Sequence, residues 1–215
     1  MNFSLKKLAS YCIDHSSKVD DILVQLERET HLKVLSPQMI SGPLQGQLLA
    51  LISRMVNPQS ILEIGTFTGY STICLAQGLK KEGIITSIES NEELKYISTK
   101  YFKLAGIEKN INQLWGDAKE IIHTLAGPFD MLFIDAGKQD YAYYYDHLID
   151  KLRPQGIIIV DNVLWSGKVT IQKKDSDTSI MDEFNKKIRD DERVDNIMLP
   201  IRDGITIIIK KEASK

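Results

Sequence analysis

The sequence predicts an α/β fold with a mostly parallel sheet and extra helices at the amino terminus. Short apolar runs alternate with amphipathic stretches from Ser60 onward, polar residues directly follow several of these runs, and a short turn joins the last two. The 215 residues, 43% hydrophobic and 26% charged, fit a single domain, 1–215. Within it we expect helices and a crossing loop in 1–57 and the sheet-containing core in 58–215.

The first part of the chain is predicted to be helical. Apolar residues spaced three and four apart favour helices over 5–12 and 19–26, which we expect to form a lid or a partner surface. Segment 35–43 contains two prolines and a glycine, so it predicts an ordered crossing loop without regular structure. A third helix is expected over about 44–56, where Asn57-Pro58 ends it.

The core is predicted to contain seven strands. Five apolar runs alternate with helical segments, as in βαβ units, and predict parallel strands. After the polar stretch 173–178, a helix over 180–189 is expected, and the short turn 200–204 joins a closing antiparallel pair. The predicted strands are 61–64, 84–88, 111–115, 131–134, 157–160, 194–199 and 204–209, and the helices between the first five start near Gly69, Glu92, Ala118 and Tyr141.

Composition excludes several classes of protein. The net charge of −2 and the pI of about 6.1 give no broad basic field for a long nucleic acid. Cys12 and Cys74 lie beside apolar residues, which favours reduced thiols and a cytoplasmic protein. No apolar run reaches the roughly 18 residues of a membrane span, so no membrane partner is expected. The four histidines lack zinc-site spacing.

The end of the first apolar run predicts a ligand site. Glu63 and Gly65 lead into a glycine-bearing turn between a strand and a helix, which is where open α/β sheets bind ligands. Glycine lets the backbone approach a ligand closely. Because the spacing is not GxGxxG, a nucleoside with an amino-acid tail fits better than a dinucleotide pyrophosphate. Taken alone, this segment is equally well explained as an ordinary βα turn.

Two further strand ends strengthen this interpretation. Glu89, at the end of the second run, would accept hydrogen bonds from both ribose hydroxyls. Asp117 and Ala118, after the third run, would bracket an adenine with a side-chain acceptor and a backbone donor. Asp117 alone is more often a helix N-cap. The three strand ends together predict a nucleoside site.

The fourth and fifth runs predict a metal site. Asp135 follows the fourth run, and Asp161 and Asn162 follow the fifth, so three oxygen ligands suited to Mg²⁺ lie at adjacent strand ends. The alternative is a helix cap and a turn, which would leave two acids crowded without a counter-ion. Lys138 would lie near the metal, where a dication disfavours its charged form, and could act as a general base.

Aromatic residues follow the predicted metal ligands. Tyr141, Tyr143, Tyr144 and Tyr145 cluster on one predicted helix, and Trp165 follows Asn162. Such side chains could clamp a planar ring, and packing on the sheet explains the tyrosines equally well. No GxSxG elbow is present, so a serine hydrolase is disfavoured.

Three segments together resemble the catechol and caffeoyl-CoA O-methyltransferase family of class I S-adenosylmethionine-dependent enzymes. These are 62–71 (LEIGTFTGYS), 133–138 (FIDAGK) and 161–165 (DNVLW). The likeness covers nearly the whole chain and is strongest to the compact bacterial members. It implies a Rossmann-like methyltransferase fold with a seven-stranded, mostly parallel sheet, an antiparallel last strand, and usually a homodimer.

The resemblance also implies roles for individual residues. It implies that Asp135, Asp161 and Asn162 hold Mg²⁺ or another divalent cation and that Lys138 is the base. Two departures from the family pattern are Gly137, where a second acid often stands, and Arg202-Asp203, where substrate hydroxyls are read. The residues implied to contact S-adenosylmethionine are Met39, Ile40, Glu63, Gly65, Thr66, Ser71, Glu89, Asp117, Ala118 and Asp135.

We therefore expect metal-dependent methylation of a small aromatic hydroxyl, such as a catechol or a caffeoyl thioester. One alternative is methylation of 5-hydroxyuridine in tRNA, for which Lys6, Lys7, Lys18 and Arg28 would form a local basic face. A nicotinamide-dependent oxidoreductase is an alternative of another class, and the missing GxGxxG argues against it. A non-catalytic module that senses the cofactor is the third alternative.

Overall fold

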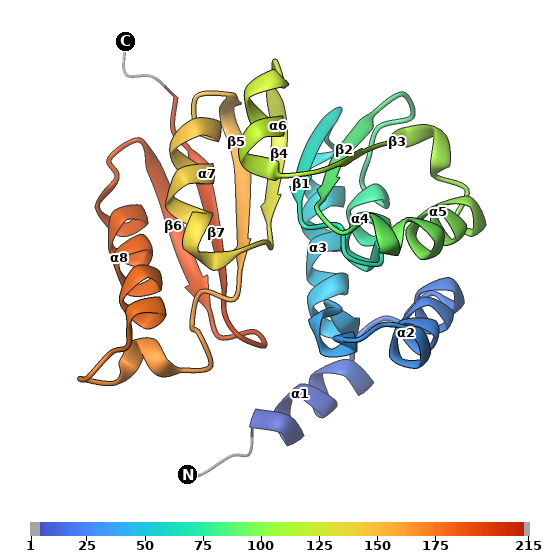
Figure 1. The fold of residues 1–215 in the computed structure, drawn as a ribbon, viewed down its shortest axis with the longest axis horizontal. Helices are drawn as coiled ribbons and strands as arrows, with labels where there is room; N and C mark the ends of the chain where they lie inside the picture. The colour runs from blue at the N-terminus through green and yellow to red at the C-terminus, as the bar shows by residue number, and fades with distance from the viewer. Residues whose placement is uncertain (1–4, 213–215) are drawn as a thin grey trace.

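The computed structural model describes residues 5–212, with side chains from Lys7 onward, and it confirms the predicted α/β fold. A single seven-stranded sheet has the order β3-β2-β1-β4-β5-β7-β6 (Figure 1). β7 runs antiparallel to both of its neighbours, and the other adjacent pairs are parallel. The strands are β1 (Ser60–Ile64), β2 (Ile84–Glu89), β3 (Ile111–Trp115), β4 (Phe129–Ile134), β5 (Leu152–Asp161), β6 (Val194–Leu199) and β7 (Ile205–Lys210).

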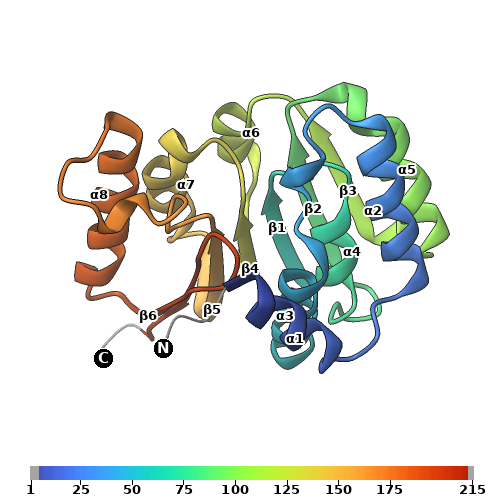
Figure 2. The ribbon, with the colours of Figure 1, turned by 90° about the horizontal axis from the view of Figure 1, so that it is seen from below.

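Helices cover both faces of the sheet (Figures 1 and 2). Helices α6, α7 and α8 pack on one face, and α3, α4 and α5 on the other, with α2 outside α4 and α5. The helices are α1 (Leu5–Asp14), α2 (Asp21–Lys33), α3 (Gly42–Val56), α4 (Tyr70–Ala76), α5 (Lys95–Leu104), α6 (Ala118–Thr124), α7 (Tyr141–Leu148) and α8 (Ser176–Asp190).

The central strands are buried on both faces, which explains why they read as continuous apolar runs. Along β4, Leu132 and Ile134 join the core under α6, α7 and α8, whereas Met131 and Phe133 join the core under α3, α4 and α5. All four side chains are 0% exposed. Alternation along the strand therefore divides one apolar run between two cores.

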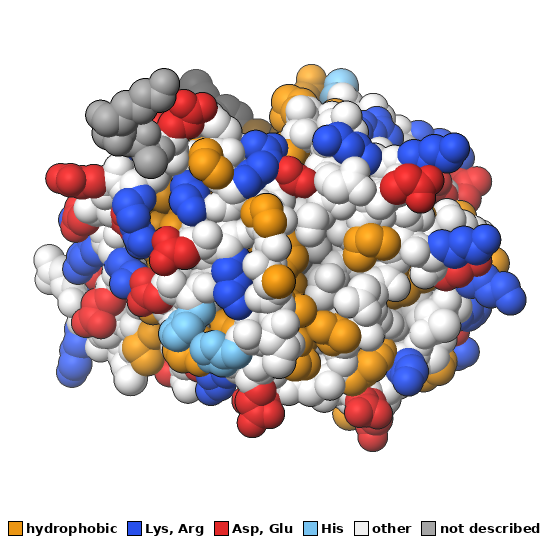
Figure 3. Space-filling view, turned by 90° about the horizontal axis from the view of Figure 1, so that it is seen from above, with side chains coloured by type: hydrophobic (Ala, Val, Ile, Leu, Met, Phe, Trp, Pro, Cys, Tyr) orange, Lys and Arg blue, Asp and Glu red, His pale blue; other side chains and the backbone are white. Residues whose placement is uncertain are grey.

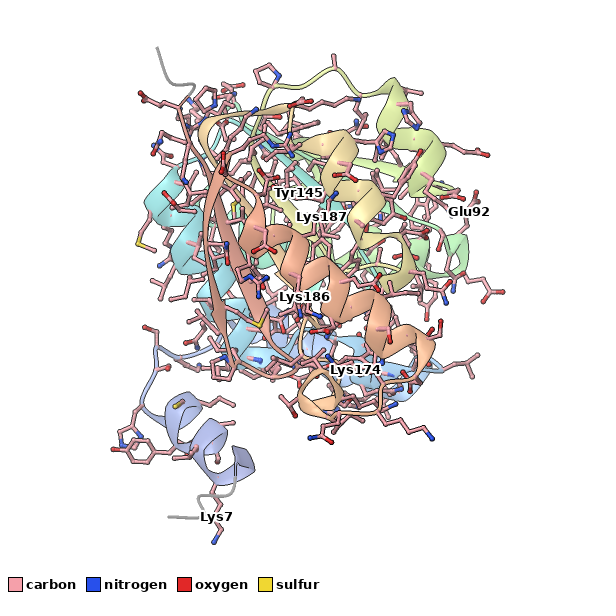
Figure 4. The ribbon with its side chains drawn as sticks, turned by 90° about the vertical axis from the view of Figure 1, so that its left-hand side faces the viewer. Lys7, Glu92, Tyr145, Lys174, Lys186 and Lys187 are labelled. Carbon is pink, nitrogen blue, oxygen red and sulfur yellow. The ribbon has the colours of Figure 1, made fainter. Side chains whose placement is uncertain are left out.

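In the sheet-containing core, two predicted starts were wrong by four or five residues. α8 begins at Ser176 and not at 180, because the Asp175 carboxylate accepts a hydrogen bond from the Thr178 N–H at 2.8 Å and caps the helix. Lys174, in the polar stretch, and Lys186, on the helix itself, both pair with Asp182, and the Lys174 pair joins the stretch to the helix (Figure 4). β5 begins at Leu152, five residues before the predicted start, across an irregular pairing with β4.

The segment before the core differs from its prediction in detail. The crossing loop contains one short 3₁₀ turn, Pro37–Met39, and α3 begins at Gly42, two residues earlier than expected. α1 packs on α3 and extends away from the sheet, with Lys7 near its outer end (Figure 4). A role for these helices as a lid or partner surface stays a prediction. Over residues 5–212, no helix is long and apolar enough to cross a membrane.

We predict that Gly78→Ala destabilises the fold through the contact of α4 with α3. A Cβ at Gly78, just after α4, would lie 2.0 Å from the backbone carbonyl carbon of Ser53 and 2.3 Å from the Arg54 nitrogen. Backbone atoms cannot give way cheaply, so we expect a loss of about 3 kcal/mol in the free energy of unfolding. Urea denaturation measures this loss.

Gly106→Ala is the matched control. Gly106 has φ +69° and no atom within 4 Å of its Cβ position, so this variant carries only left-handed backbone strain. That strain costs about 1 kcal/mol. Equal losses in the two variants would contradict the overpacking argument.

Candidate active site

The strand ends that carry the predicted ligands lie side by side. In β1, Ile64 pairs with Ile88 of β2 on one side and with Ile134 of β4 on the other. Ile134 pairs in turn with Val160 of β5. Strand order reverses between β1 and β4, and open α/β sheets bind ligands at such a reversal. The residues that follow these four positions therefore share one edge of the sheet: Glu89, Gly65, Asp135 and Asp161.

Gly65 holds the closest approach at this edge. Its φ is +99°, and a Cβ there would lie 1.9 Å from the carbonyl oxygen of Asp135. The Asp135 N–H donates to the Ile64 carbonyl at 2.9 Å, and the Gly65 N–H donates to the Ile88 carbonyl at 2.9 Å. Only glycine fits between the two strand ends, so Gly65 permits the glycine-bearing turn after β1 and Asp135 to lie together.

A cavity of about 910 Å³ opens at this edge of the sheet. Its volume lies in the range of small-molecule sites. Most of the residues predicted from the sequence line it, although they come from six separate stretches of the chain. The lining includes Met39, Gly65, Glu89, Asp117, Ala118, Asp135, Lys138, Asp161 and Asn162.

Four other predicted residues, Ile40, Glu63, Thr66 and Ser71, are buried and lie outside that lining. Ile40 packs in the core, and its carbonyl accepts a hydrogen bond from Arg202 Nη1 at 2.6 Å. The Thr66 hydroxyl bonds the Ser87 hydroxyl at 2.5 Å. These four side chains therefore lie behind the residues that line the cavity, and their contact with a ligand stays a prediction.

Glu63 is a fully buried carboxylic acid beneath the glycine-bearing turn after β1. Its oxygens accept hydrogen bonds from the hydroxyls of Ser71 at 2.5 Å, Thr72 at 2.5 Å and Ser87 at 2.6 Å. Burial raises the pKa of Glu63 from 4.5 to about 7, although the three hydroxyls act in the opposite direction. Glu63 therefore changes between its protonated and ionised forms near neutral pH.

The nucleoside half of the cavity has oriented acceptors. Glu89 Oε2 accepts the Phe67 N–H at 2.7 Å, and Oε1 accepts the Asn91 N–H at 2.9 Å. Each oxygen keeps a lone pair for a further donor. Asp117 caps α6 by accepting the Lys119 N–H at 2.8 Å, so its N-cap role is confirmed, and it also lines the cavity. These side chains can receive a ribose and an adenine.

The two carboxylates at the other end of the cavity fit a cation. Asp161 is 3% exposed, and Asp135 is partly exposed to the cavity. Burial, and then the nearby charge of Asp161, raise the pKa of Asp135. With Asn162 these two side chains offer hard oxygen ligands, and a divalent cation would relieve their repulsion. Within the described residues no group of three or more His, Cys, Asp or Glu side chains could hold a metal, and the role of the Asn162 amide as third ligand stays a prediction.

Three lysines line the cavity, and they differ in whether an acidic side chain pairs with them. Lys119 pairs with Asp140 at 3.2 Å, and Lys168 pairs with Asp175 at 3.5 Å. Lys138 makes no ion pair or side-chain hydrogen bond with any residue of the described chain. Its amine is therefore available to a ligand in the cavity.

The aromatic cluster divides between the core and the cavity. Tyr141 and Tyr145 are buried and pack edge-on against Phe184, at ring-centroid distances of 5.6 Å and 6.5 Å. Tyr144 and Trp165 line the cavity. Packing in the core is thus shown for Tyr141 and Tyr145, and a contact of Tyr144 or Trp165 with a planar ring stays a prediction.

Sequence reasoning missed the environment of Asp161. Gln45 of α3 is buried, and its Nε2 donates to Asp161 Oδ2 at 2.7 Å. Arg202 bonds the crossing loop through the carbonyls of Ile40, Ser41 and Gln38. Gln45 lies 116 residues from Asp161 in the chain, so helical spacing was the only signal and it could not reveal the contact.

Comparison with known proteins gives consistent matches. The profile of the family described as O-methyltransferase matches residues 13–211. A caffeoyl-CoA O-methyltransferase of Stellaria longipes is 31% identical over 94% of this chain and 89% of its own. A Podospora anserina methyltransferase solved with SAH bound has a TM-score of 0.89 at 28% identity, covering 99% and 98% of the two chains. A Bacillus cereus O-methyltransferase in complex with SAH has a TM-score of 0.87 at 28% identity, covering 95% and 97%.

We predict that Glu63 makes stability depend on pH. Because folding raises the pKa of Glu63 from 4.5 to about 7, its contribution is complete below pH 4.5 and is lost as the pH rises through 7. Between about pH 5 and about pH 8, wild-type protein should lose about 2 to 3 kcal/mol of unfolding free energy relative to Glu63→Gln. Urea denaturation at both pH values measures this difference.

Glu29→Gln is the control for this experiment. Hydrogen bonds from Lys100 and Lys33 lower the pKa of Glu29 to about 2, so it stays ionised over the whole interval. Its stability difference from wild type should not change between the two pH values. A constant difference for Glu63→Gln as well would show that Glu63 does not titrate there.

Proposed function

This chain belongs to the O-methyltransferase family of S-adenosylmethionine-dependent enzymes, and from that premise we propose that it methylates a hydroxyl of a catechol-like or caffeoyl-type aromatic with a divalent cation such as Mg²⁺. The observation that carries the proposal is the placement of Asp135 and Asp161 after paired residues of β4 and β5, on the wall of the cavity. The family assignment argues against a nicotinamide oxidoreductase and a non-catalytic module.

The donor half of the cavity binds by hydrogen bonds. Bound S-adenosylmethionine would supply an electrophilic methyl group on its sulfonium. Glu89 would accept from the ribose hydroxyls, and Asp117 would accept from the adenine amine. Holding donor and acceptor in one cavity makes the transfer effectively unimolecular, which is a large part of the expected rate acceleration.

The acceptor half binds and deprotonates the hydroxyl. Asp135, Asp161 and Asn162 would hold the cation, which would supply positive charge that favours the ionised hydroxyl. Lys138 Nζ, in its unprotonated form, would take the hydroxyl proton. Lys138 lines the cavity, and among the described side chains no ion pair would have to break for it to do so. Tyr144 and Trp165 would pack against the aromatic ring of the substrate.

Substrate size separates the aromatic proposal from the tRNA alternative. Within the basic set proposed for tRNA, Lys18 pairs with Asp21 at 2.9 Å, and the Lys6 side chain lies outside the described residues. Basic and acidic side chains are intermixed on the face shown in Figure 3. The Lys18–Asp21 pair and the name of the Stellaria relative support a small acceptor. The homodimer and the cytoplasmic location stay predictions.

A radiolabelled methyl-transfer screen with and without EDTA tests the proposal over catechols, caffeoyl thioesters and tRNA. We expect transfer to a small aromatic hydroxyl, and a fall of about 100-fold or more on chelation. Asp161→Asn should reduce transfer by a similar factor, because it removes one charge of the metal site. Transfer to tRNA in place of the aromatics would select the alternative substrate.

Asp195→Asn is the matched control, since this carboxylate lies on β6 and pairs with Lys211 at 3.1 Å. It should keep wild-type activity and metal dependence. EDTA-insensitive transfer that survives Asp161→Asn would refute metal assistance, with far-ultraviolet circular dichroism confirming that both variants are folded.

The base is tested separately. We predict that Lys138→Met lowers kcat by about 100-fold or more, as expected for removal of a general base. The loss should be smaller with a nitro-substituted catechol, because its more acidic hydroxyl needs less help to ionise. Lys168→Met removes another cavity lysine and should have little effect on kcat. Equal losses in both variants, with no dependence on hydroxyl acidity, would disprove the assignment.

A further inference from the structure

Gln45 is a polar residue at an apolar position. It is 0% exposed and shares the buried face of α3 with Leu49 and Ile52, one and two turns further along. A buried amide costs free energy unless it is hydrogen bonded. Its bond to Asp161 Oδ2 at 2.7 Å meets this need. An apolar side chain would fill this buried position equally well, so we attribute the amide at this position to its hydrogen bond with Asp161.

Both oxygens of Asp161 are held. Oδ1 accepts the Asn162 N–H at 2.7 Å, and Oδ2 accepts Gln45 Nε2 at 2.7 Å. A carboxylate bonded at both oxygens from two elements cannot rotate freely. Each oxygen still has one lone pair for another ligand. Asp161 therefore faces the cavity in a fixed orientation.

Arg202 lies beside the oxygen of the Gln45 amide. Its Nη1 lies 3.5 Å from Gln45 Oε1 and 2.6 Å from the Ile40 carbonyl. A guanidinium can only donate and an ionised carboxylate can only accept, so the amide oxygen must face Arg202 and the amide nitrogen must face Asp161. The chain Arg202–Gln45–Asp161 thus has a single hydrogen-bonding direction.

We propose that Gln45 is a positioning residue for the cation site: it holds the Asp161 carboxylate in the orientation that binds the metal. The proposal rests on the proposed metal dependence. Gln45 does not line the cavity and touches no reacting group, so it acts only through Asp161. Loss of such a second-sphere bond typically weakens metal binding by about 10- to 100-fold.

Calorimetric titration of Mn²⁺ into the enzyme without acceptor tests the proposal. Gln45→Met keeps the length of the side chain and suits a buried site, but it removes the donor to Asp161. We expect it to raise the Mn²⁺ Kd by about 10-fold or more. Gln47→Met is the matched control: Gln47 lies two residues along α3 and donates to the Ser17 carbonyl. It should leave the Mn²⁺ Kd within about twofold.

Two further measurements separate positioning from a merely structural role. Because the metal ligands remain, saturating Mn²⁺ should return kcat of Gln45→Met to near the wild-type value, so the defect appears in the metal requirement. The Kd for SAH should change by less than about threefold, because the donor half is untouched. If Gln45→Met does not fold, Gln45→Asn takes its place, since its amide is one methylene too short to reach Asp161.

The outcomes are distinguishable. Wild-type Mn²⁺ affinity in a folded Gln45 variant, alongside loss of affinity in Asp161→Asn, would overturn the role of Gln45 and leave the metal proposal intact. Absence of Mn²⁺ binding by wild-type enzyme, or equal binding by Asp161→Asn, would overturn both.

Discussion

The close approach of β1 and β4 is the constraint on which the site depends. Gly65 and Asp135 meet where the strand order reverses, and a Cβ at Gly65 would lie 1.9 Å from the Asp135 carbonyl oxygen. This contact brings the turn of the nucleoside half beside the first carboxylate of the cation half. Because β2 pairs in parallel with β1 and β5 with β4, Glu89 and Asp161 lie at the same edge of the sheet, on either side of this contact. One absent methyl group therefore lets two binding sites share a cavity.

Much of this arrangement could be predicted from the sequence because its signals are local. A strand buried on both faces reads as an apolar run, and the residue that ends it lies at a known edge of a parallel sheet. Asp135, Asp161 and Glu89 were found in this way. Boundaries were predicted less well where a single side chain determines them. The polar composition around Asp175 predicted a loop, but its carboxylate caps α8, and the helix begins there.

The remainder depends on contacts between distant segments, which no local pattern reveals. Alternation along β1 turns Glu63 into the core, where it meets three hydroxyls that the sequence did not reveal, and its expected contact with the ligand stays a prediction. Arg202 lines the cavity, and the sequence did not predict that its guanidinium also bonds the crossing loop. Gln45 carried no sequence signal beyond its place in an amphipathic helix. In each case the partner lies in another element, so only the assembled fold identifies the role.

The bonds from Arg202 to the crossing loop have a consequence for how this chain can change. The guanidinium of Arg202, in the β6–β7 hairpin, bonds the carbonyls of Ile40 and Ser41 in the crossing loop, which lie 162 and 161 residues earlier in the chain. A change in the length of either segment would displace the other or break the bonds to Arg202. Loops that border binding sites usually tolerate insertions well. In this fold the two that border the cation site are bound to each other, and diversity in acceptor choice would have to arise from side-chain replacement and not from loop length.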